Sequence, residues 1–494
     1  MSVRSNTSNG NFSKFFPFIV VLGSGLYPFS HYYSNNLSIA DSFFQFSLLA
    51  FFCFGIPLIV VLVCKLLVKF KFFSFFKEAY LSIINFITFS ILLSYLIFHF
   101  GKGRMIFLVL MSLIFGFFLH KYLKKIIILQ LLVAGISLVS FAPKLWFALN
   151  ANNDWSKVPE EMLRAPLQKY PNIFVIQPDG YSNSETLKKP PYNYDNSEFE
   201  GWLENKNFKI YEGYKSNYYS TLTSNSSMFA MKHHYYCNTD PKTIKTFNAT
   251  DVIVGSDNNV LKLLKHNLYS SYLFTDNSYF LSNRRKLFFD KMNISRSSIP
   301  LFNASNIEGV NIQSDLTQHL DSLSTDRNFI FIEKTVPGHV SHSKIWSVGK
   351  EQERVEYLTR LQEANDWLKG IVEVILEYDD NALIIIVADH GGYVGLEYTG
   401  VAIQRALNEE EAISSFSAFL SVKWPKEVND DRINIRTSVN LFSQIFYSLS
   451  NNPLFVDSLQ NDASYLPLKT DGKAFFYKVI DEEDNVNTAP LSDN

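Results

Sequence analysis

The first third of the chain is almost continuously apolar, from about Phe15 to Leu149, and its charged residues lie in short islands. A helix needs about 20 apolar residues to cross the hydrocarbon core of a bilayer, so stretches of this length predict membrane-spanning helices. We expect five such spans, near residues 15–33, 43–64, 79–98, 105–119 and 126–149. The fourth span is short and the first contains two prolines, which leaves the number open by one.

Lysines between the predicted spans indicate the orientation of this membrane part. They gather between the second and third spans and between the fourth and fifth, at Lys65, Lys69, Lys71, Lys77, Lys121, Lys124 and Lys125. Loops rich in Lys and Arg stay in the cytoplasm, so the N-terminus is predicted to be cytoplasmic. With an odd number of spans, everything after Leu149 is then extracytoplasmic. The spans contain almost no ionisable residues, which favours a membrane anchor over a channel or transporter.

The rest of the chain has the alternating pattern of an α/β domain. We expect a polar connector at 150–170, a folded domain from 171 to about 470, and a loose polar tail at 471–494. The spacing of apolar residues over 351–376 predicts a helix. Short apolar runs predict strands at 173–176, 270–274, 329–332, 383–387 and 416–422. Strands that alternate with helices predict a doubly wound α/β sheet with helices on both faces.

Two of these apolar runs stop at acidic residues that stand beside glycine. The run 173–177 is followed by Asp179, and the run 383–388 by Asp389 and His390. Unbroken apolar runs are typical of buried parallel strands, and open α/β sheets bind their ligands beyond the carboxyl ends of such strands. Two carboxylates and an imidazole at one sheet edge suit Zn²⁺ or Mn²⁺.

A hydroxyl-rich segment lies between these two strands, over residues 216–229. Its serines and threonines give way to apolar residues, which is the pattern of a helix start. A hydroxyl at a helix start, two carboxylates and an imidazole form one candidate site. A metal there would lower the pKa of the hydroxyl, and the helix dipole would help to hold an anion.

These motifs, in their order along the chain, resemble those of the alkaline phosphatase superfamily. They are Asp179-Gly180-Tyr181, Asp195-Asn196-Ser197-Glu198-Phe199, Ser216-Asn217-Tyr218-Tyr219-Ser220-Thr221 and Asp389-His390-Gly391. The most similar branch is that of sulfatase-like, membrane-anchored phosphotransferases, which includes phosphoethanolamine transferases, lipoteichoic acid synthases and bacterial multi-span proteins. The resemblance covers most of the chain. It implies a bundle of about five transmembrane helices followed by an extracytoplasmic, sulfatase-like α/β domain.

The resemblance also implies roles for the site residues. Asp179, Asp389, His390 and Thr221 would hold one divalent metal, Zn or Mn. Thr221 would be the nucleophile, because it begins the T-x-x-S-x-x-x-M pattern of phosphoethanolamine transferases. Thr223 stays open as an alternative, because the sequence that follows it is similar to the core motif of lipoteichoic acid synthases. Sulfatase chemistry is not expected, because the sulfatase Pro and Arg are missing and Thr cannot become formylglycine.

Two histidines and an asparagine complete the implied site. His339 would bind the substrate phosphate or act as a general acid, with His342 as a possible helper, and Asn217 would touch the transferred group. Two-metal relatives carry ligands that this chain lacks. Thr335 stands where they have Asp, and no histidine follows His390, so one metal is the better prediction.

Four residues near these motifs are interpreted differently. Glu333 falls where close relatives have an extra histidine, which leaves the question of a second metal site open. His233 and His234 follow the nucleophile helix and are expected in surface or packing positions, because adjacent side chains on a helix point different ways. Cys237 is the only cysteine after residue 150, so no disulfide is expected inside that domain.

The sequence therefore predicts a membrane-anchored enzyme of the bacterial inner or plasma membrane. It would move a phospho-head-group, such as phosphoglycerol or phosphoethanolamine, from a membrane phospholipid to a cell-surface glycan or lipid through a phosphothreonine. Hydrolysis, with water as acceptor, and a non-catalytic subunit of an envelope assembly are the alternatives. With 45 Lys and Arg against 47 Asp and Glu, the net charge of −2 argues against a nucleic-acid partner.

Overall fold

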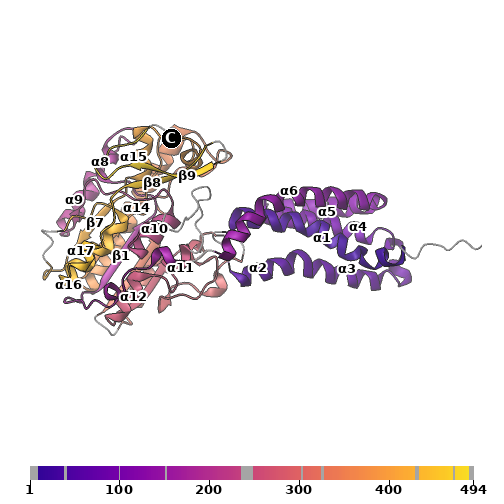
Figure 1. Ribbon diagram of the computed structural model, residues 1–494, viewed down its shortest axis with the longest axis horizontal. Coiled ribbons are helices and arrows are strands. Elements are labelled where there is room, and N and C mark those ends of the chain that lie inside the picture. The colour runs from indigo at the N-terminus through magenta and orange to yellow at the C-terminus, as the bar shows by residue number, and fades with distance from the viewer. Residues whose placement is uncertain are drawn as a thin grey trace, which may run out of the picture. The chain divides into compact units, whose positions relative to one another are not determined.

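The computed structural model divides the chain into two compact units, Met1–Ala151 and Asn152–Asn494 (Figure 1). The residues that it describes are 9–37, 40, 42–98, 101–150, 153–234, 249–301, 304–323, 327–428, 433–470 and 473–488. Cys237, for which no disulfide was expected, lies outside them.

The first unit contains five helical segments that overlap the five expected spans. They are α1 (Asn9–Asn36), α2 (Phe43–Ala50) continued through a π-helical turn (Phe51–Gly55) into α3 (Ile56–Leu67), α4 (Tyr80–Leu96), α5 (Lys102–Phe118) and α6 (Leu123–Asn150). Among the described residues, Phe43–Leu67 and His120–Asn150 are long and apolar enough to cross a membrane, and Tyr80–Leu96 is a shorter apolar helix. Five crossings therefore stay a prediction.

Several polar side chains are buried inside this unit, beside apolar ones such as Val20 and Val21. Asn85 of α4 and Gln130 of α6 are buried and exchange two hydrogen bonds of 3.0 Å. Ser30 Oγ of α1 donates to Ser137 Oγ of α6 at 2.9 Å. Many large apolar side chains of this unit point outward, and the side chain of Phe43 is 84% exposed. Helices in lipid pack through small and polar residues, because lipid removes the hydrophobic drive between them. The arrangement suits a unit whose outer surface faces lipid.

The second unit is built on a seven-stranded mixed sheet in the order β2-β7-β6-β1-β5-β3-β4. Its strands are β1 (Ile173–Pro178), β2 (Lys209–Ile210), β3 (Ser270–Thr275), β4 (Lys291–Met292), β5 (Asn328–Lys334), β6 (Leu383–Val387) and β7 (Leu420–Lys423). The strands from β6 to β4 in this order run parallel, whereas β7 is antiparallel to β6 and β2 is antiparallel to β7. Every residue of β1 and β6 is buried, so both faces of the central sheet are covered.

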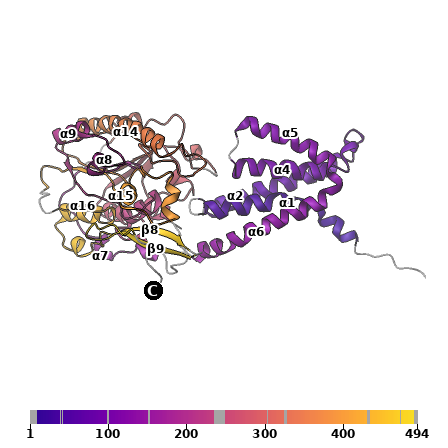
Figure 2. The same cartoon turned by 90° about the horizontal axis from the view of Figure 1, so that it is seen from above.

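Helices provide that cover, and Figure 2 shows α14 and α16 on opposite sides of the unit. The helices are α7 (Glu160–Leu163), α8 (Ser184–Lys188), α9 (Ser197–Asn205), α10 (Thr221–Ala230), α11 (Ala249–Ile253), α12 (Asn259–His266), α13 (Ile312–Leu320), α14 (Lys350–Tyr378), α15 (Glu409–Phe416), α16 (Leu441–Ser450) and α17 (Leu454–Asp457). The helix expected over 351–376 is confirmed as α14. Its buried residues, such as Leu361, Ala364 and Leu368, recur every three or four positions.

The apolar run 416–422 is not one strand, contrary to expectation. Asn408 and Glu411 form a reciprocal capping box, in which each side chain accepts a hydrogen bond from the backbone N–H of the other. This cap starts α15, which continues to Phe416, and β7 begins only at Leu420. A capping box satisfies N–H groups at a helix start, so it favours helix over strand across this segment.

The folded unit also extends beyond both of its expected ends. The expected loose tail contains β9 (Lys473–Ile480), which pairs antiparallel with β8 (Ser464–Thr470) in a separate two-stranded sheet. In the expected connector, Trp155 is buried against Ala230 and Val252. Both segments are polar on average, but their few apolar side chains find partners in the folded domain.

His233 and His234 are packing residues, as expected, and both are fully buried. The ring of His234 lies 4.9 Å from that of Trp155, edge to face. His233 Nε2 donates to the carbonyl of Asn461 at 2.9 Å, and Nδ1 lies 3.1 Å from the hydroxyl of Tyr218. Burial lowers the pKa of each histidine from 6.5 to about 4, because the charged form loses its hydration.

The domain should therefore lose stability in acid, and His234→Leu should reduce that loss. The folded pKa lies below the unfolded value of 6.5, so the contribution of the neutral ring is complete above pH 6.5 and is lost as pH falls toward 4. At pH 4 the loss is roughly 3 kcal/mol for each histidine. Thermal unfolding of the full chain in detergent at pH 7.5, 5.5 and 4.5 would measure it. An unchanged pH dependence in His234→Leu would contradict this account.

Candidate active site

The two acidic strand ends meet because β1 and β6 are neighbours in the sheet. The strands are parallel and in register, with Ile173 opposite Leu383 and Ile176 opposite Ile386. Asp179 follows β1 directly, and the turn after β6 brings Asp389 beside it: the backbone N–H of Gly180 donates to Asp389 Oδ1 at 3.1 Å. The carboxyl edge of the sheet thus joins residues from distant parts of the sequence, as the sequence predicted.

One ligand atom from each of Asp179, Asp389 and His390 converges on a point. These three atoms lie within 4.8 Å of one another, and all three residues are buried. His390 Nε2 is 3.5 Å from Asp179 Oδ1 and 3.3 Å from Asp389 Oδ2. Thr221 Oγ1 is 3.3 Å from the same Nε2 atom. The four residues expected to hold a metal are therefore together.

The hydrogen bonds around these atoms leave the converging ones available to a cation. His390 Nδ1 lies 2.9 Å from the carbonyl of Gly391. A carbonyl can only accept, so Nδ1 carries the proton and Nε2 presents its lone pair. Asp179 Oδ1 and Asp389 Oδ2 are buried and have no hydrogen-bond partner among the residues that the structure describes. Two hard oxygens, one imidazole nitrogen and one hydroxyl fit a single Zn²⁺ or Mn²⁺.

The electrostatics of the cluster also demand positive charge. Burial, and next the carboxylate of Asp389, raise the pKa of Asp179 to about 7. Burial by itself would lower the pKa of His390, but the carboxylates of Asp389 and Asp179 outweigh it and raise that pKa above the ordinary value. Two buried carboxylates this close repel each other unless a proton or a metal ion neutralises them. The cluster is therefore suited to binding a cation.

Thr221 occupies the first position of α10 and lines the cavity of the site, whereas Thr223 does not reach it. Ser220, the N-cap of α10, does not cap the helix with its side chain. Its hydroxyl instead lies 2.8 Å from Thr223 Oγ1, which also donates to the Ser220 carbonyl at 3.1 Å. Thr223 is 3% exposed and turned into the helix start. The first turn of α10 therefore begins without a side-chain cap, at the point where Ser220 and Thr221 line the cavity, and N–H groups at a helix start favour anions.

A cavity of about 530 Å³ opens beside these ligands. It is lined by Asp179, Tyr219, Ser220, Thr221, Asn277, Tyr279, Ala304, Glu333, Thr335, His339, His342, His390, Tyr393 and Thr399. His339 and His342 were expected there, and both contribute to the wall. The Asn217 side chain does not: its Nδ2 donates to the Ala463 carbonyl at 2.9 Å and its Oδ1 accepts from the N–H of Val439 at 2.8 Å. Its role is to hold the segment before α10 in place.

His339 reaches the cavity through a close backbone contact. Gly180 has a φ of +67°, and a Cβ there would lie 2.4 Å from the carbonyl oxygen of Gly338, so only glycine lets the two turns meet. His339 Nδ1 donates to the carbonyl of Val340 at 2.6 Å, which leaves Nε2 to accept a proton. Burial, and next the neighbouring His390, lower the pKa of His339 to about 4, so the ring is neutral before substrate binds.

Glu333 is the polar group of the cavity whose role the sequence left open. It follows the apolar residues of β5, one position before the strand ends at Lys334, and is 4% exposed. Thr275 Oγ1 donates to its Oε2 at 2.6 Å. Burial raises the pKa of Glu333 to about 8, so it lines the cavity as a neutral acid. A charged residue that closes an apolar run was the available signal. For Tyr279 and Tyr393, which also line the cavity, the sequence offered none.

No family model and no curated protein matches the chain. Solved structures do. The lipoteichoic acid synthase LtaP from Listeria monocytogenes is 15% identical, with 69% of this chain and 92% of that one covered and a TM-score of 0.41. The C-terminal periplasmic domain of phosphoethanolamine transferase EptC from Campylobacter jejuni is 14% identical, with 61% and 96% covered and a TM-score of 0.38. That of EcEptC from Escherichia coli, in complex with Zn, is 9% identical, with 64% and 96% covered and a TM-score of 0.41.

Identities and scores at this level carry nothing about activity, which has to be argued from the site itself. The site offers a hydroxyl at a helix start, two buried carboxylates with unpaired oxygens, and an imidazole nitrogen with a free lone pair. The solved structures that the chain is similar to include a lipoteichoic acid synthase and phosphoethanolamine transferases, the two kinds of enzyme that its sequence motifs resemble.

Proposed function

We propose that the protein is a metal-dependent transferase of phospho-head-groups, and that Thr221 carries the group between donor and acceptor. The observation that carries this proposal is the position of Thr221 Oγ1, 3.3 Å from His390 Nε2 and next to two unpaired carboxylate oxygens. Oxygen nucleophiles need such an environment, because a threonine hydroxyl is inert at its ordinary pKa. A bound Zn²⁺ or Mn²⁺, held by Asp179, Asp389, His390 and Thr221, would supply that activation and offset the charge of the phosphate.

In the first half-reaction, Thr221 Oγ attacks the phosphorus of a phospholipid head group. The bond from phosphorus to Oγ forms, and the bond from phosphorus to the diacylglycerol oxygen breaks. His339 Nε2, neutral and with its lone pair available, accepts the hydroxyl proton and passes it to the departing diacylglycerol. The N–H groups at the start of α10 stabilise the phosphoryl oxygens.

The second half-reaction reverses these roles. A hydroxyl of a cell-surface glycan or lipid attacks the phosphothreonine, gives its proton to His339 Nε2, and receives the head group. The proton then returns to Thr221 Oγ, so the enzyme is restored. Water as the acceptor would give hydrolysis by the same steps.

The proposed reaction takes place at a membrane. We propose that the five helical segments of the first unit cross the bacterial inner or plasma membrane with the N-terminus in the cytoplasm and the catalytic unit outside. The outward apolar side chains of this unit and its buried polar pairs support that placement. A catalytic unit tethered to the bilayer meets phospholipid at a high effective concentration.

Trapping the covalent intermediate tests the proposal. The full-length protein, in nanodiscs that contain phosphatidylethanolamine or phosphatidylglycerol with isotope-labelled head groups and no glycan acceptor, would be digested and mapped by mass spectrometry. A labelled phosphate adduct on Thr221, retained in Thr223→Ala, is the expected result and names the donor. An adduct on Thr223 would move the nucleophile. No adduct, together with no bound metal, would favour a non-catalytic envelope subunit.

A further inference from the structure

The loop 341–349, between β5 and α14, presents its large apolar side chains to solvent. Ile345 is 88% exposed, Trp346 71% and Val348 55%. Elsewhere in the described part of the second unit, side chains of this kind that are exposed come singly, from three separate places in the sequence: Leu268, Val355 and Val456. A cluster of exposed apolar residues on one loop marks an interaction surface, because leaving such residues in water is unfavourable.

The exposure is built into the loop by hydrogen bonds at both of its ends. Glu353 of α14 is 2% exposed, and its carboxylate accepts from the backbone N–H of Ser341 at 2.9 Å and of Val348 at 3.2 Å. The N–H of Trp346 donates to the Ser343 carbonyl at 3.1 Å. The buried carboxylate of Glu353 thus holds the loop backbone in the conformation in which these apolar side chains face solvent.

The loop is also part of the rim of the active-site cavity. It follows His339 in the chain, and it contains His342, which lines the cavity. Thr399 also lines the cavity, and it donates its N–H to the Ser341 carbonyl at 2.9 Å. Whatever covers the loop therefore stands at the entrance to the site.

The chemistry of the loop fits a lipid surface. Tryptophan prefers the interface between headgroups and acyl chains, and isoleucine prefers the acyl region. Two exposed cations, Lys344 and Lys350, flank the apolar residues and suit anionic headgroups.

We propose that the loop 341–349 inserts Ile345 and Trp346 into the bilayer surface. The entrance of the cavity is thereby kept next to the phospholipid that the enzyme uses as substrate. The membrane contact is inferred from the exposed residues of the loop alone. Its consequence for substrate access rests on the proposed transferase function. The substrate would then be a phospholipid presented in the bilayer rather than one free in solution.

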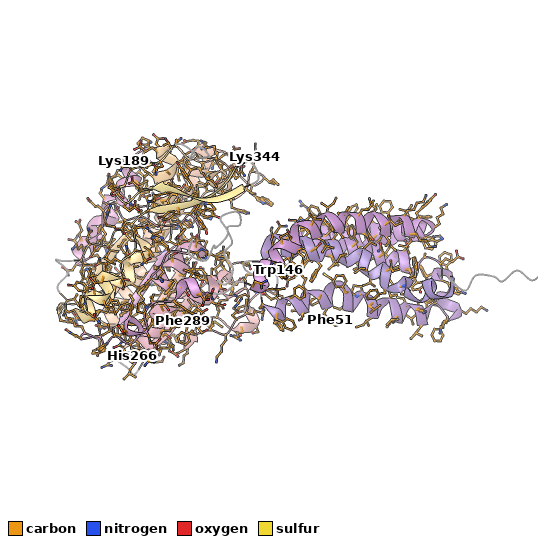
Figure 3. All side chains as sticks on the ribbon, viewed as in Figure 1. Phe51, Trp146, Lys189, His266, Phe289 and Lys344 are labelled. Carbon is orange, nitrogen blue, oxygen red and sulfur yellow. The ribbon has the colours of Figure 1, made fainter. Side chains whose placement is uncertain are left out.

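The first test measures membrane contact without reference to activity. In the full chain with Cys53, Cys64 and Cys237 replaced by alanine, an environment-sensitive fluorophore is attached at Ile345→Cys or at Lys189→Cys. Figure 3 shows Lys344, of the same loop, and Lys189 at separate places on the surface of the unit, and Lys189 is the control. The nanodiscs contain phosphatidylethanolamine, phosphatidylglycerol and a spin-labelled phospholipid.

The expected result is quenching at position 345, by about twofold or more, and none at position 189. If the spin-labelled lipid quenches the two positions equally, or quenches neither, the proposal is overturned. So would a blue shift at position 345 without quenching by the spin-labelled lipid, because protein would then cover the loop, either the first unit or a second copy.

The second test separates membrane contact from chemistry. The double variant Ile345→Ser, Trp346→Ser should raise KM for bilayer phospholipid about tenfold, since it removes two inserted side chains. Its kcat/KM for a soluble, short-chain phospholipid should not change. Equal losses on both donors would mean that the loop shapes the cavity, which contradicts the proposal. If the unmodified enzyme turns over neither donor, the transferase function fails while the quenching result still decides the membrane contact.

Discussion

Thr221→Ala is expected to lower kcat for head-group transfer by about 10³- to 10⁶-fold, the range seen when a covalent nucleophile is removed. Thr221 Oγ1 lies 3.3 Å from His390 Nε2, at the proposed metal-ligand cluster. The side chain lines the cavity, so its truncation leaves the core intact. Initial rates with nanodisc phospholipid, together with thermal unfolding, would separate lost chemistry from lost fold.

Two matched variants sharpen this result. Thr221→Ser keeps the hydroxyl and should retain most of the activity. Thr223→Ala removes a hydroxyl of the same helix turn that bonds to Ser220, so it should cost about 1 kcal/mol of stability and leave kcat nearly unchanged. If Thr223→Ala instead abolishes transfer while Thr221→Ala retains more than a tenth of the rate, the nucleophile has been assigned to the wrong residue.

Asp389→Asn is expected to weaken metal binding more than about 100-fold and to abolish transfer with it. The carboxylate has two tasks. Its Oδ1 accepts the N–H groups of Gly180 and His390 at 3.1 Å each, and its Oδ2 is buried without a partner at the converging point. An asparagine keeps the first task and loses the second. Metal analysis of the purified full chain should give about one Zn²⁺ or Mn²⁺ in the unmodified protein. The same result is expected for the control Asp366→Asn, because Asp366 is an exposed residue of α14.

The effect of Asp389→Asn on stability should have opposite signs without and with metal. Without metal, the variant removes one of two buried like charges and should be more stable than the unmodified protein, on the order of 1 kcal/mol. With metal at about 1,000 times its Kd, the unmodified protein gains about 4 kcal/mol and the variant gains little. Thermal unfolding with chelator and with added Zn²⁺ would show both effects. A variant that is destabilised equally in the two conditions would indicate a structural carboxylate and no metal site.

The residues that we propose as metal ligands were predictable because each is marked by a local pattern. A strand buried on both faces must be apolar along its length, so the polar residue that ends it stands out, as Asp179 and Asp389 do. A change from hydroxyl-bearing to apolar residues similarly indicates a helix start. This pattern located the segment that contains Thr221. The likeness of motifs to phosphotransferases then supplied the chemistry. That β1 and β6 lie side by side was an inference from the parallel-sheet rule, and the register of the two strands confirms it.

The local sequence pattern did not determine which of several neighbouring side chains points toward the site. Thr221 and Thr223 are chemically alike and two positions apart, and only the direction of α10 turns one to the cavity and the other to Ser220. Asn217 belongs to a motif that suggested substrate contact, but its amide is taken up by the backbone of Ala463 and Val439. The partners of Thr221 and Asn217 are distant in the sequence, so no short window of the chain contains this information.

The sequence by itself determined the apolar first unit, the alternating α/β second unit, and the residues able to hold a metal, because composition and periodicity are properties of short segments. Tertiary structure alone decided the walls of the cavity, the folding of both ends of the domain, and the exposure of the loop 341–349. Ile345 and Trp346 belong in a core by composition. They face solvent because Glu353, buried in α14, binds the backbone at both ends of their loop. A contact of that kind exists only once the helix and the loop have folded together.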